Sequence, residues 1–225
     1  MAQAIGIACT TVAANYETAH SQAGQWDGGL STLAGMIAAL MAQQGMEAGY
    51  SGLEGPGPSG GGDTRWKKGF CHTFGAGNEV LSVLTRNLGH EYETTKLQIK
   101  SRVAFYWNHA AINAVCHIFK NHALTPSDVE KITVRSHKLF PGYDSRVDDH
   151  SLIVGHNVPY ATAVAILEEN DVTLLDDMVR HLHNPVARDL MGKFVLEAEP
   201  DFDKYFTSAM PATATVETKD GSVYE

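Results

Sequence analysis

Residues 93–136 read ETTKLQIKSRVAFYWNHAAINAVCHIFKNHALTPSDVEKITVRS. Polar and apolar residues alternate over 93–101, which is the period of a half-buried strand. Asn108 is a good helix N-cap, and apolar residues recur after it at helical spacing. Residues 125–128, TPSD, are a capping signal that predicts one short helical turn ahead of a second strand at 131–136. Strands and helices that interleave in this way predict an α+β layer.

The chain after this stretch continues the same mixed pattern. Residues 159–169 predict a helix, and Asn184 starts another one with proline at its first position. Residues 194–199 and 213–218 predict strands, because β-branched and apolar residues alternate with polar ones there. We therefore expect residues 93–225 to form an α+β domain.

The chain before this stretch is predicted to be helical. Residues 2–20 and 31–44 carry apolar residues at three- and four-residue intervals, so each is expected to form a helix with an apolar face. The tract GPGPSGGG at 55–62 predicts a flexible loop. The predicted organisation ahead of the α+β domain is a helical-domain portion, a flexible loop and a connecting helical segment, at residues 1–54, 55–68 and 69–92.

The composition is that of an acidic globular protein. The 225 residues include 17 Lys and Arg against 26 Asp and Glu, which gives a formal net charge of −9. Nucleic acids and anionic membranes are both bound through dense positive patches, so this balance argues against either as a partner. No stretch approaches the roughly 20 apolar residues of a membrane span, and no basic secretory signal opens the chain. We expect a cytoplasmic protein.

Six short sequence blocks, spread over nearly the whole chain, occur in the order found in one known family. In the fourth block, Lys100 stands nine residues ahead of His109, which begins His-Ala-Ala-Ile. This block resembles a family strand with Lys-Pro-Tyr-Pro that leads into a helix with Thr-His-x-x-Ile. On these grounds the chain resembles the MmgE/PrpD family. The six blocks lie at residues 4–8, 38–46, 53–70, 99–112, 159–174 and 184–191.

The resemblance implies both a fold and a class of reaction. The implied fold is a large all-helical domain followed by a smaller α+β lid domain, assembled as a homodimer. Family members include 2-methylcitrate dehydratase, cis-aconitate decarboxylase and iminodisuccinate epimerase, which act beside a carboxylate without a metal or an organic cofactor. We therefore expect a lyase for a di- or tricarboxylate, with dehydration of 2-methylcitrate as the first candidate and decarboxylation of cis-aconitate as the second. The three cysteines form no Cys-x-x-Cys pair, which also argues against a zinc or iron–sulfur site.

Elimination beside a carboxylate needs a base, an acid and cations that hold the substrate. Lys100 and His109 are the candidate catalytic residues, because a histidine in the first turn of a helix lies where free backbone N–H groups attract an anion. The alternative is that His109 only begins a helix and that Lys100 is a solvated surface residue. The candidate substrate-binding residues are Arg102, which stands where the family has Pro-Tyr-Pro, and His156, Asn157 and Tyr160, which lie at or just before a block that lines the lid close to the site in the family.

The resemblance also predicts that part of the catalytic machinery lies outside this sequence. Family members are roughly twice as long, and their acidic and histidine-bearing helices have no counterpart here. We expect a homo-oligomer or a partner chain that carries the missing helical half, and negligible turnover from this chain alone. The alternative is a truncated or split member without catalytic activity, a subunit or a remnant. Gly24, Asp27 and Arg102 favour this alternative, because many members have a Lys and a His at the first two places and Pro-Tyr-Pro at the third.

Overall fold

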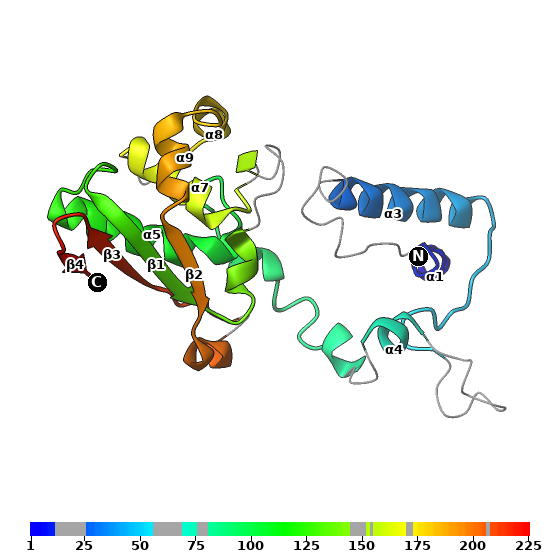
Figure 1. Cartoon of the computed structure of the whole chain (residues 1–225). Coiled ribbons are helices and arrows are strands. Elements are labelled where there is room, and N and C mark those ends of the chain that lie inside the picture. Colours follow the sequence, from blue (N-terminus) through cyan, green and yellow to red (C-terminus); the bar gives the residue numbers. More distant parts are fainter. Residues whose placement is uncertain are drawn as a thin grey trace. The chain divides into compact units, whose positions relative to one another are not determined.

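The computed structural model divides the chain into two compact units, Met1–Leu97 and Gln98–Glu225 (Figure 1). None of the helices that it describes is both long enough and apolar enough to span a bilayer. The residues described are 1–11, 26–55, 69–75, 81–144, 152–153, 155–169, 173–205 and 208–225.

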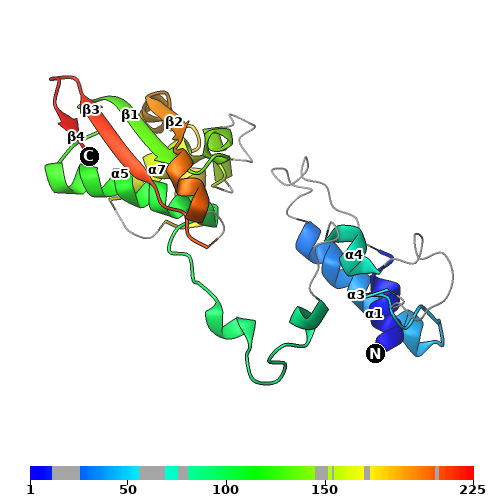
Figure 2. The same ribbon diagram turned by 90° about the horizontal axis from the view of Figure 1, so that it is seen from below.

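Two helices dominate the first unit. The helix α1 (Ala2–Ala8) contacts α3 (Asp27–Gln43), and a short helix α4 (Phe70–Phe74) follows (Figure 2). The predicted helix at 31–44 is confirmed by α3, which begins four residues earlier. The predicted helix at 2–20 is confirmed only over α1, because residues 12–25 lie outside the described ranges. The expected flexible loop also falls almost wholly outside them.

The second unit is built on a four-stranded mixed sheet in the order β2-β1-β3-β4. The central strand β1 (Val129–Ser136) pairs in parallel with β2 (Phe194–Ala198) and antiparallel with β3 (Thr213–Thr218). The edge strand β4 (Val223–Tyr224) closes a hairpin with β3. The three strands predicted at 131–136, 194–199 and 213–218 are confirmed, and so is the α+β class of this part of the chain. The predicted all-helical domain ahead of it stays a prediction.

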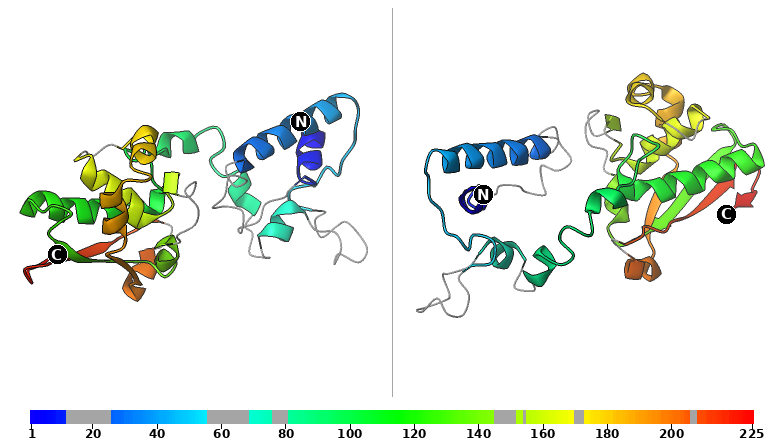
Figure 3. Two further views of the ribbon diagram at one scale, coloured as in Figure 1. Left: turned by 45° about the horizontal axis from the view of Figure 1, so that its top comes forward. Right: turned by 180° about the vertical axis from the view of Figure 1, so that it is seen from behind.

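Helices cover one face of this sheet in two layers. The helix α5 (His109–His122) contacts β1 and β3, as Figure 3 shows from behind, and α7 (Val158–Leu167) packs on α5. All residues of α7 from Val158 to Ala165 are buried, which is typical of a helix that is apolar all round. Two short helices, α8 (Leu175–Arg180) and α9 (Pro185–Met191), pack against α7. The predicted helices at 159–169 and from Asn184 are thus confirmed.

The strand predicted at 93–101 is wrong. Glu93–Lys96 forms a 3-10 turn, and Leu97 and Ile99 are 76% and 99% exposed. This segment spans the boundary between the two units, and no strand lies beside it among the described residues. Alternation alone does not stabilise a strand, because a strand also needs a hydrogen-bonded neighbour and a surface to cover. The sheet that contains 131–136 therefore does not include residues 93–101.

Asn184 holds the ends of three helices together. Its Oδ1 accepts a hydrogen bond from the Val186 N–H over 2.9 Å, which caps α9. Its Nδ2 bonds to His181 Nδ1 over 2.9 Å, and the other ring nitrogen of His181 bonds to Glu168 at the end of α7. The chain of bonds joins α7, the C-cap of α8 and the N-cap of α9.

We expect Asn184→Ala to lower the free energy of unfolding by about 1–2 kcal/mol, because it removes a helix cap and a partner of His181. Urea titration of both variants and the wild type measures the change. Asn184→Asp is the matched control, since it keeps the capping oxygen and should lose less stability. Equal stability of Asn184→Ala and the wild type would contradict the cap.

Candidate functional site

The two predicted catalytic side chains meet at one backbone oxygen. Lys100 Nζ donates a hydrogen bond to the Ala104 carbonyl over 3.0 Å, and the His109 ring also hydrogen bonds to the Ala104 backbone. Both side chains therefore lie next to Ala104. The structure thus brings together two residues that are nine positions apart in sequence. We call this pair the Lys100–His109 site; its catalytic roles stay a prediction.

The backbone around Ala104 packs directly on Gly155. Gly155 has a φ of +70°, and a Cβ atom there would lie 2.3 Å from the Val103 carbonyl oxygen and 2.6 Å from the Ala104 Cα. Only glycine combines that φ with so close an approach of another backbone segment. The Phe105 N–H donates to the Gly155 carbonyl over 3.1 Å. These contacts fix the position of the shared carbonyl oxygen.

Asn108 stands at the N-cap of α5, but its side chain makes no capping hydrogen bond, so the predicted capping role is wrong. A capping side chain needs extended backbone angles, whereas Asn108 is helical because the 3-10 turn Tyr106–Asn108 leads directly into α5. Its buried Nδ2 instead donates to the carbonyls of Gly155 and His156 over 3.4 and 3.3 Å. Asn108 therefore ties the start of α5 to the segment that supports Ala104.

His109 is the first residue of α5, and its ring is partly buried. Burial lowers the pKa of His109 below its ordinary value, and the nearby charges of Lys100 and Arg102 lower it further. The hydrogen bond to the Ala104 backbone acts in the opposite direction. The ring is therefore mainly neutral near pH 7. Its Nε2 is buried and has no hydrogen-bond partner within the described ranges.

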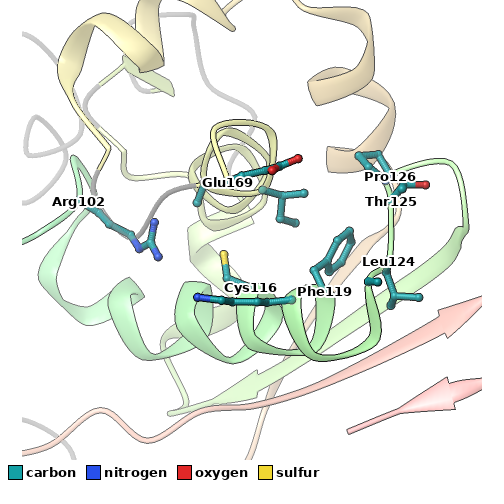
Figure 4. A pocket seen from close by; sticks show the side chains of 11 residues that line it. Arg102, Cys116, Phe119, Leu124, Thr125, Pro126 and Glu169 are labelled. Atoms are coloured by element: carbon teal, nitrogen blue, oxygen red, sulfur yellow. The ribbon is translucent and has the colours of Figure 1, made fainter.

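Arg102 is almost fully buried, with 4% of its surface exposed. Its Nε donates to Asn113 Oδ1 over 3.3 Å, and its backbone forms a parallel bridge with Thr173. The guanidinium lines a pocket of about 420 Å³ between α5 and α7 (Figure 4). Its charge also acts on the His109 ring, so Arg102 is close to that ring and also lines this pocket.

The three remaining candidates lie on the segment that leads into α7. The His156 ring packs edge-on against Phe105, with ring centroids 5.5 Å apart. Asn157 is buried, and its Oδ1 caps α7 by accepting from the Tyr160 N–H over 2.8 Å. Tyr160 is fully buried, and its hydroxyl donates to the Met178 carbonyl. Asn157 and Tyr160 therefore contribute to the packing around α7, and their role in substrate binding stays a prediction.

Sequence reasoning missed Ala104 and Gly155. The atom of Ala104 that accepts from Lys100 is a carbonyl oxygen, which every residue has, so no sequence signal marks it. Gly155 stands directly ahead of His156 and the capping Asn157, where a glycine is a signal for a backbone that turns sharply or approaches another segment. Over the described parts of the chain, no three His, Cys, Asp or Glu side chains gather closely enough to hold a metal ion.

Comparison with known proteins gives one finding at the level of a family. A family model described as the MmgE/PrpD C-terminal domain matches residues 104–225, which is more than half of the chain. The match begins at Ala104 and includes His109, whereas Lys100 and Arg102 lie just ahead of it. No curated protein matches the chain.

Proposed function

This chain belongs to the MmgE/PrpD family, and from that premise we propose that its Lys100–His109 site binds a di- or tricarboxylate for metal-free elimination. Dehydration of 2-methylcitrate is the first candidate reaction. Decarboxylation of cis-aconitate is the alternative, because it needs the same recognition of carboxylates. A subunit that binds the carboxylate without converting it is the third possibility.

The observation that supports this proposal is the unused Nε2 atom of His109. A buried polar atom without a hydrogen bond costs about 1–3 kcal/mol, which a ligand that pairs with it would offset. The atom lies at the start of α5, where the positive end of the helix dipole attracts negative charge, and beside the Lys100 ammonium. A substrate carboxylate suits this combination once the ring is protonated, because Nε2–H then donates a charge-assisted hydrogen bond, which is about twice as strong as a neutral one.

The same geometry suggests a chemical role for each group. A neutral His109 can take the proton from the carbon next to the carboxylate. Lys100 would hold that carboxylate while negative charge develops on it, and the Arg102 charge adds to the same field. The leaving hydroxide also needs a proton donor, which we assign to a second chain.

Nuclear magnetic resonance of substrate mixtures tests this proposal. Formation of the dehydrated alkene from 2-methylcitrate supports the first reaction, and release of carbon dioxide from cis-aconitate supports the alternative. Ligand-observed spectra of the same samples report binding, so binding without any product supports the non-catalytic subunit. Absence of binding to both compounds at millimolar concentration would contradict the carboxylate site.

We expect carboxylate binding to strengthen as the pH falls. The pKa of free His109 is below its ordinary value, and a bound anion raises it, so the ligand binds the protonated form more tightly. As the pH falls, the affinity should begin to rise below the His109 pKa of the complex and should level off below the His109 pKa of the free protein. The total gain in affinity should be about tenfold for each unit between these two pKa values. Calorimetry with tartrate, whose carboxyls stay ionised over this range, measures the effect. A His109→Gln variant should show a flat profile, and an equal slope in that variant would assign the titration to another group.

We also propose that two copies of the chain associate through the first unit. The apolar side chains of Met36 and Leu40 on α3 are 62% and 58% exposed, and Ile37 between them is 43% exposed. Monomers rarely leave such neighbouring apolar residues uncovered. Light scattering over a range of concentrations should therefore give a dimer mass, which Leu40→Lys should reduce to that of a monomer. A monomer at every concentration would count against the association.

A further inference from the structure

Asn108 has a buried amide oxygen that accepts no hydrogen bond from any part of the chain that the structure describes. The exposed fraction of the residue is 0%, and its Oδ1 atom has no hydrogen-bond partner. Such atoms are rare in folded proteins, because burial removes their bonds to water and only a partner inside the protein replaces them. One explanation for this oxygen is a bound molecule that donates the missing hydrogen bond.

The orientation of the Asn108 amide is fixed by its nitrogen. Nδ2 donates to the carbonyls of Gly155 and His156, and carbonyls can only accept, so the amide nitrogen and oxygen cannot exchange places. The two hydrogens of the nitrogen are used by these two bonds. The remaining capacity of the amide is therefore to accept a hydrogen bond at Oδ1, and a ligand must supply the donor.

The unpartnered oxygen belongs to the surroundings of the Lys100–His109 site. His109 follows Asn108 directly, and its Nε2 is also buried without a partner among the described residues. The His109 ring bonds to the Ala104 backbone, which packs on Gly155, and Gly155 is one of the two residues that hold the Asn108 amide. The two unpartnered atoms therefore belong to side chains that are held at one backbone contact.

The charge at this place favours a hydroxyl group as the donor. Only an O–H or an N–H group can bond to Oδ1. An ammonium group would be repelled by the charge of Lys100, which is near enough to lower the pKa of His109. A hydroxyl group is neutral and avoids this repulsion. In a hydroxy acid it also stands within a few bonds of a carboxylate, which Lys100 attracts.

We propose that Asn108 is a specificity-determining residue that accepts a hydrogen bond from a hydroxyl group of the carboxylate ligand. This inference rests on the carboxylate site proposed above, and it narrows the preferred ligands of that site to hydroxy acids. An unsaturated acid such as cis-aconitate has no hydroxyl group, so it leaves Oδ1 without a partner and binds more weakly. Asn108 thus favours a substrate that can still lose water over one that is already an alkene.

Citrate and tricarballylate are a matched pair of probes, because they differ only by the hydroxyl group on the central carbon. Calorimetry with the full-length chain, at one pH at which both are fully ionised, gives the ratio of their dissociation constants. Citrate should bind about five- to fiftyfold more tightly, which is the range for one hydrogen bond to a buried acceptor. Both ligands are titrated into the same sample, so incomplete folding of a variant does not change the ratio.

Two substitutions of nearly equal shape isolate the acceptor. Asn108→Val removes it, so citrate and tricarballylate should then bind about equally. Asn108→Thr supplies a hydroxyl oxygen and should keep part of the preference for citrate. Asn121→Val makes the same change at an exposed position near the other end of α5 and should leave the ratio of the wild type. His109→Gln should weaken both ligands without changing the ratio.

The outcomes distinguish a failure of this inference from a failure of the proposed function. If neither probe binds the wild type at millimolar concentration, the carboxylate site is wrong and the hydroxyl contact is wrong with it. If both bind with equal affinity, the carboxylate site stands and only the hydroxyl contact is wrong, as it would be if Oδ1 pairs with water alone. A preference for citrate that persists in Asn108→Val would assign the hydroxyl contact to another residue and would overturn the role of Asn108.

Discussion

Gly155→Ala is expected to lower the free energy of unfolding of the second unit by about 2–5 kcal/mol. A left-handed backbone costs an alanine about 1–2 kcal/mol, and forcing an extra methyl group into a packed region costs about 1–3 kcal/mol more. The added Cβ would lie 2.3 Å from the Val103 carbonyl oxygen and 2.6 Å from the Ala104 Cα. Both are backbone atoms, so the loop itself must move. Urea titration followed by hydrogen exchange in α5 and β1 reports the second unit alone.

Substitutions at two other glycines of the second unit separate the cost of the left-handed backbone from the cost of the added methyl group. Gly221 has a φ of +87° but open space where a Cβ would be added, so Gly221→Ala should lose only the backbone contribution of about 1–2 kcal/mol. Gly142 also has open space and no positive φ, so Gly142→Ala should stay within about 0.5 kcal/mol of the wild type. Equal stability of the Gly155 and Gly221 variants would mean that the contact with Ala104 is not tight.

Lys100→Met and His109→Gln are each expected to weaken carboxylate binding by about 1–3 kcal/mol, because each removes one charge-assisted or buried hydrogen bond to the ligand. The double variant should lose less than the sum of the single variants, since both side chains share the Ala104 carbonyl and one ligand. Calorimetry with 2-methylcitrate and cis-aconitate gives the dissociation constants, and urea titration shows whether the fold is kept.

Lys138→Met and His183→Gln are the matched controls, because both residues are exposed and lie away from Ala104 in the contacts described. They should bind the two carboxylates as the wild type does. Unchanged affinity in both site variants would reject the Lys100–His109 site, whereas an equal loss in site and control variants would show a general effect of surface charge.

Local sequence patterns were sufficient to predict most helices and strands of the second unit. Apolar and polar residues alternate along most of β1 and along β3. The helices α7 and α9 each begin after an asparagine that caps them. The same kind of pattern failed at 93–101, because alternation is local whereas a strand depends on a neighbour that the local sequence does not reveal.

The candidate site was likewise predicted in part by local sequence and in part not. The nine-residue spacing and the family resemblance were enough to pair Lys100 with His109. What joins them is a main-chain oxygen held in place by Gly155, and this depends on contacts between segments about 50 residues apart. The role of Asn108 was mistaken for a related reason, since its backbone angles are set by the turn that precedes α5.

The position of β1 in the sheet has a consequence for synthesis on the ribosome. Ile132 of this central strand pairs with Phe194 on one side and Val216 on the other, so neither neighbour exists when β1 is made. The helix α5 precedes β1 and packs on it, so it can cover the strand first. Pairings this distant in sequence make folding slow and leave strand edges open for longer. During translation, α5 can therefore cover the apolar face of β1 at once, whereas the two edges of β1 stay unpaired until β2 and β3 emerge.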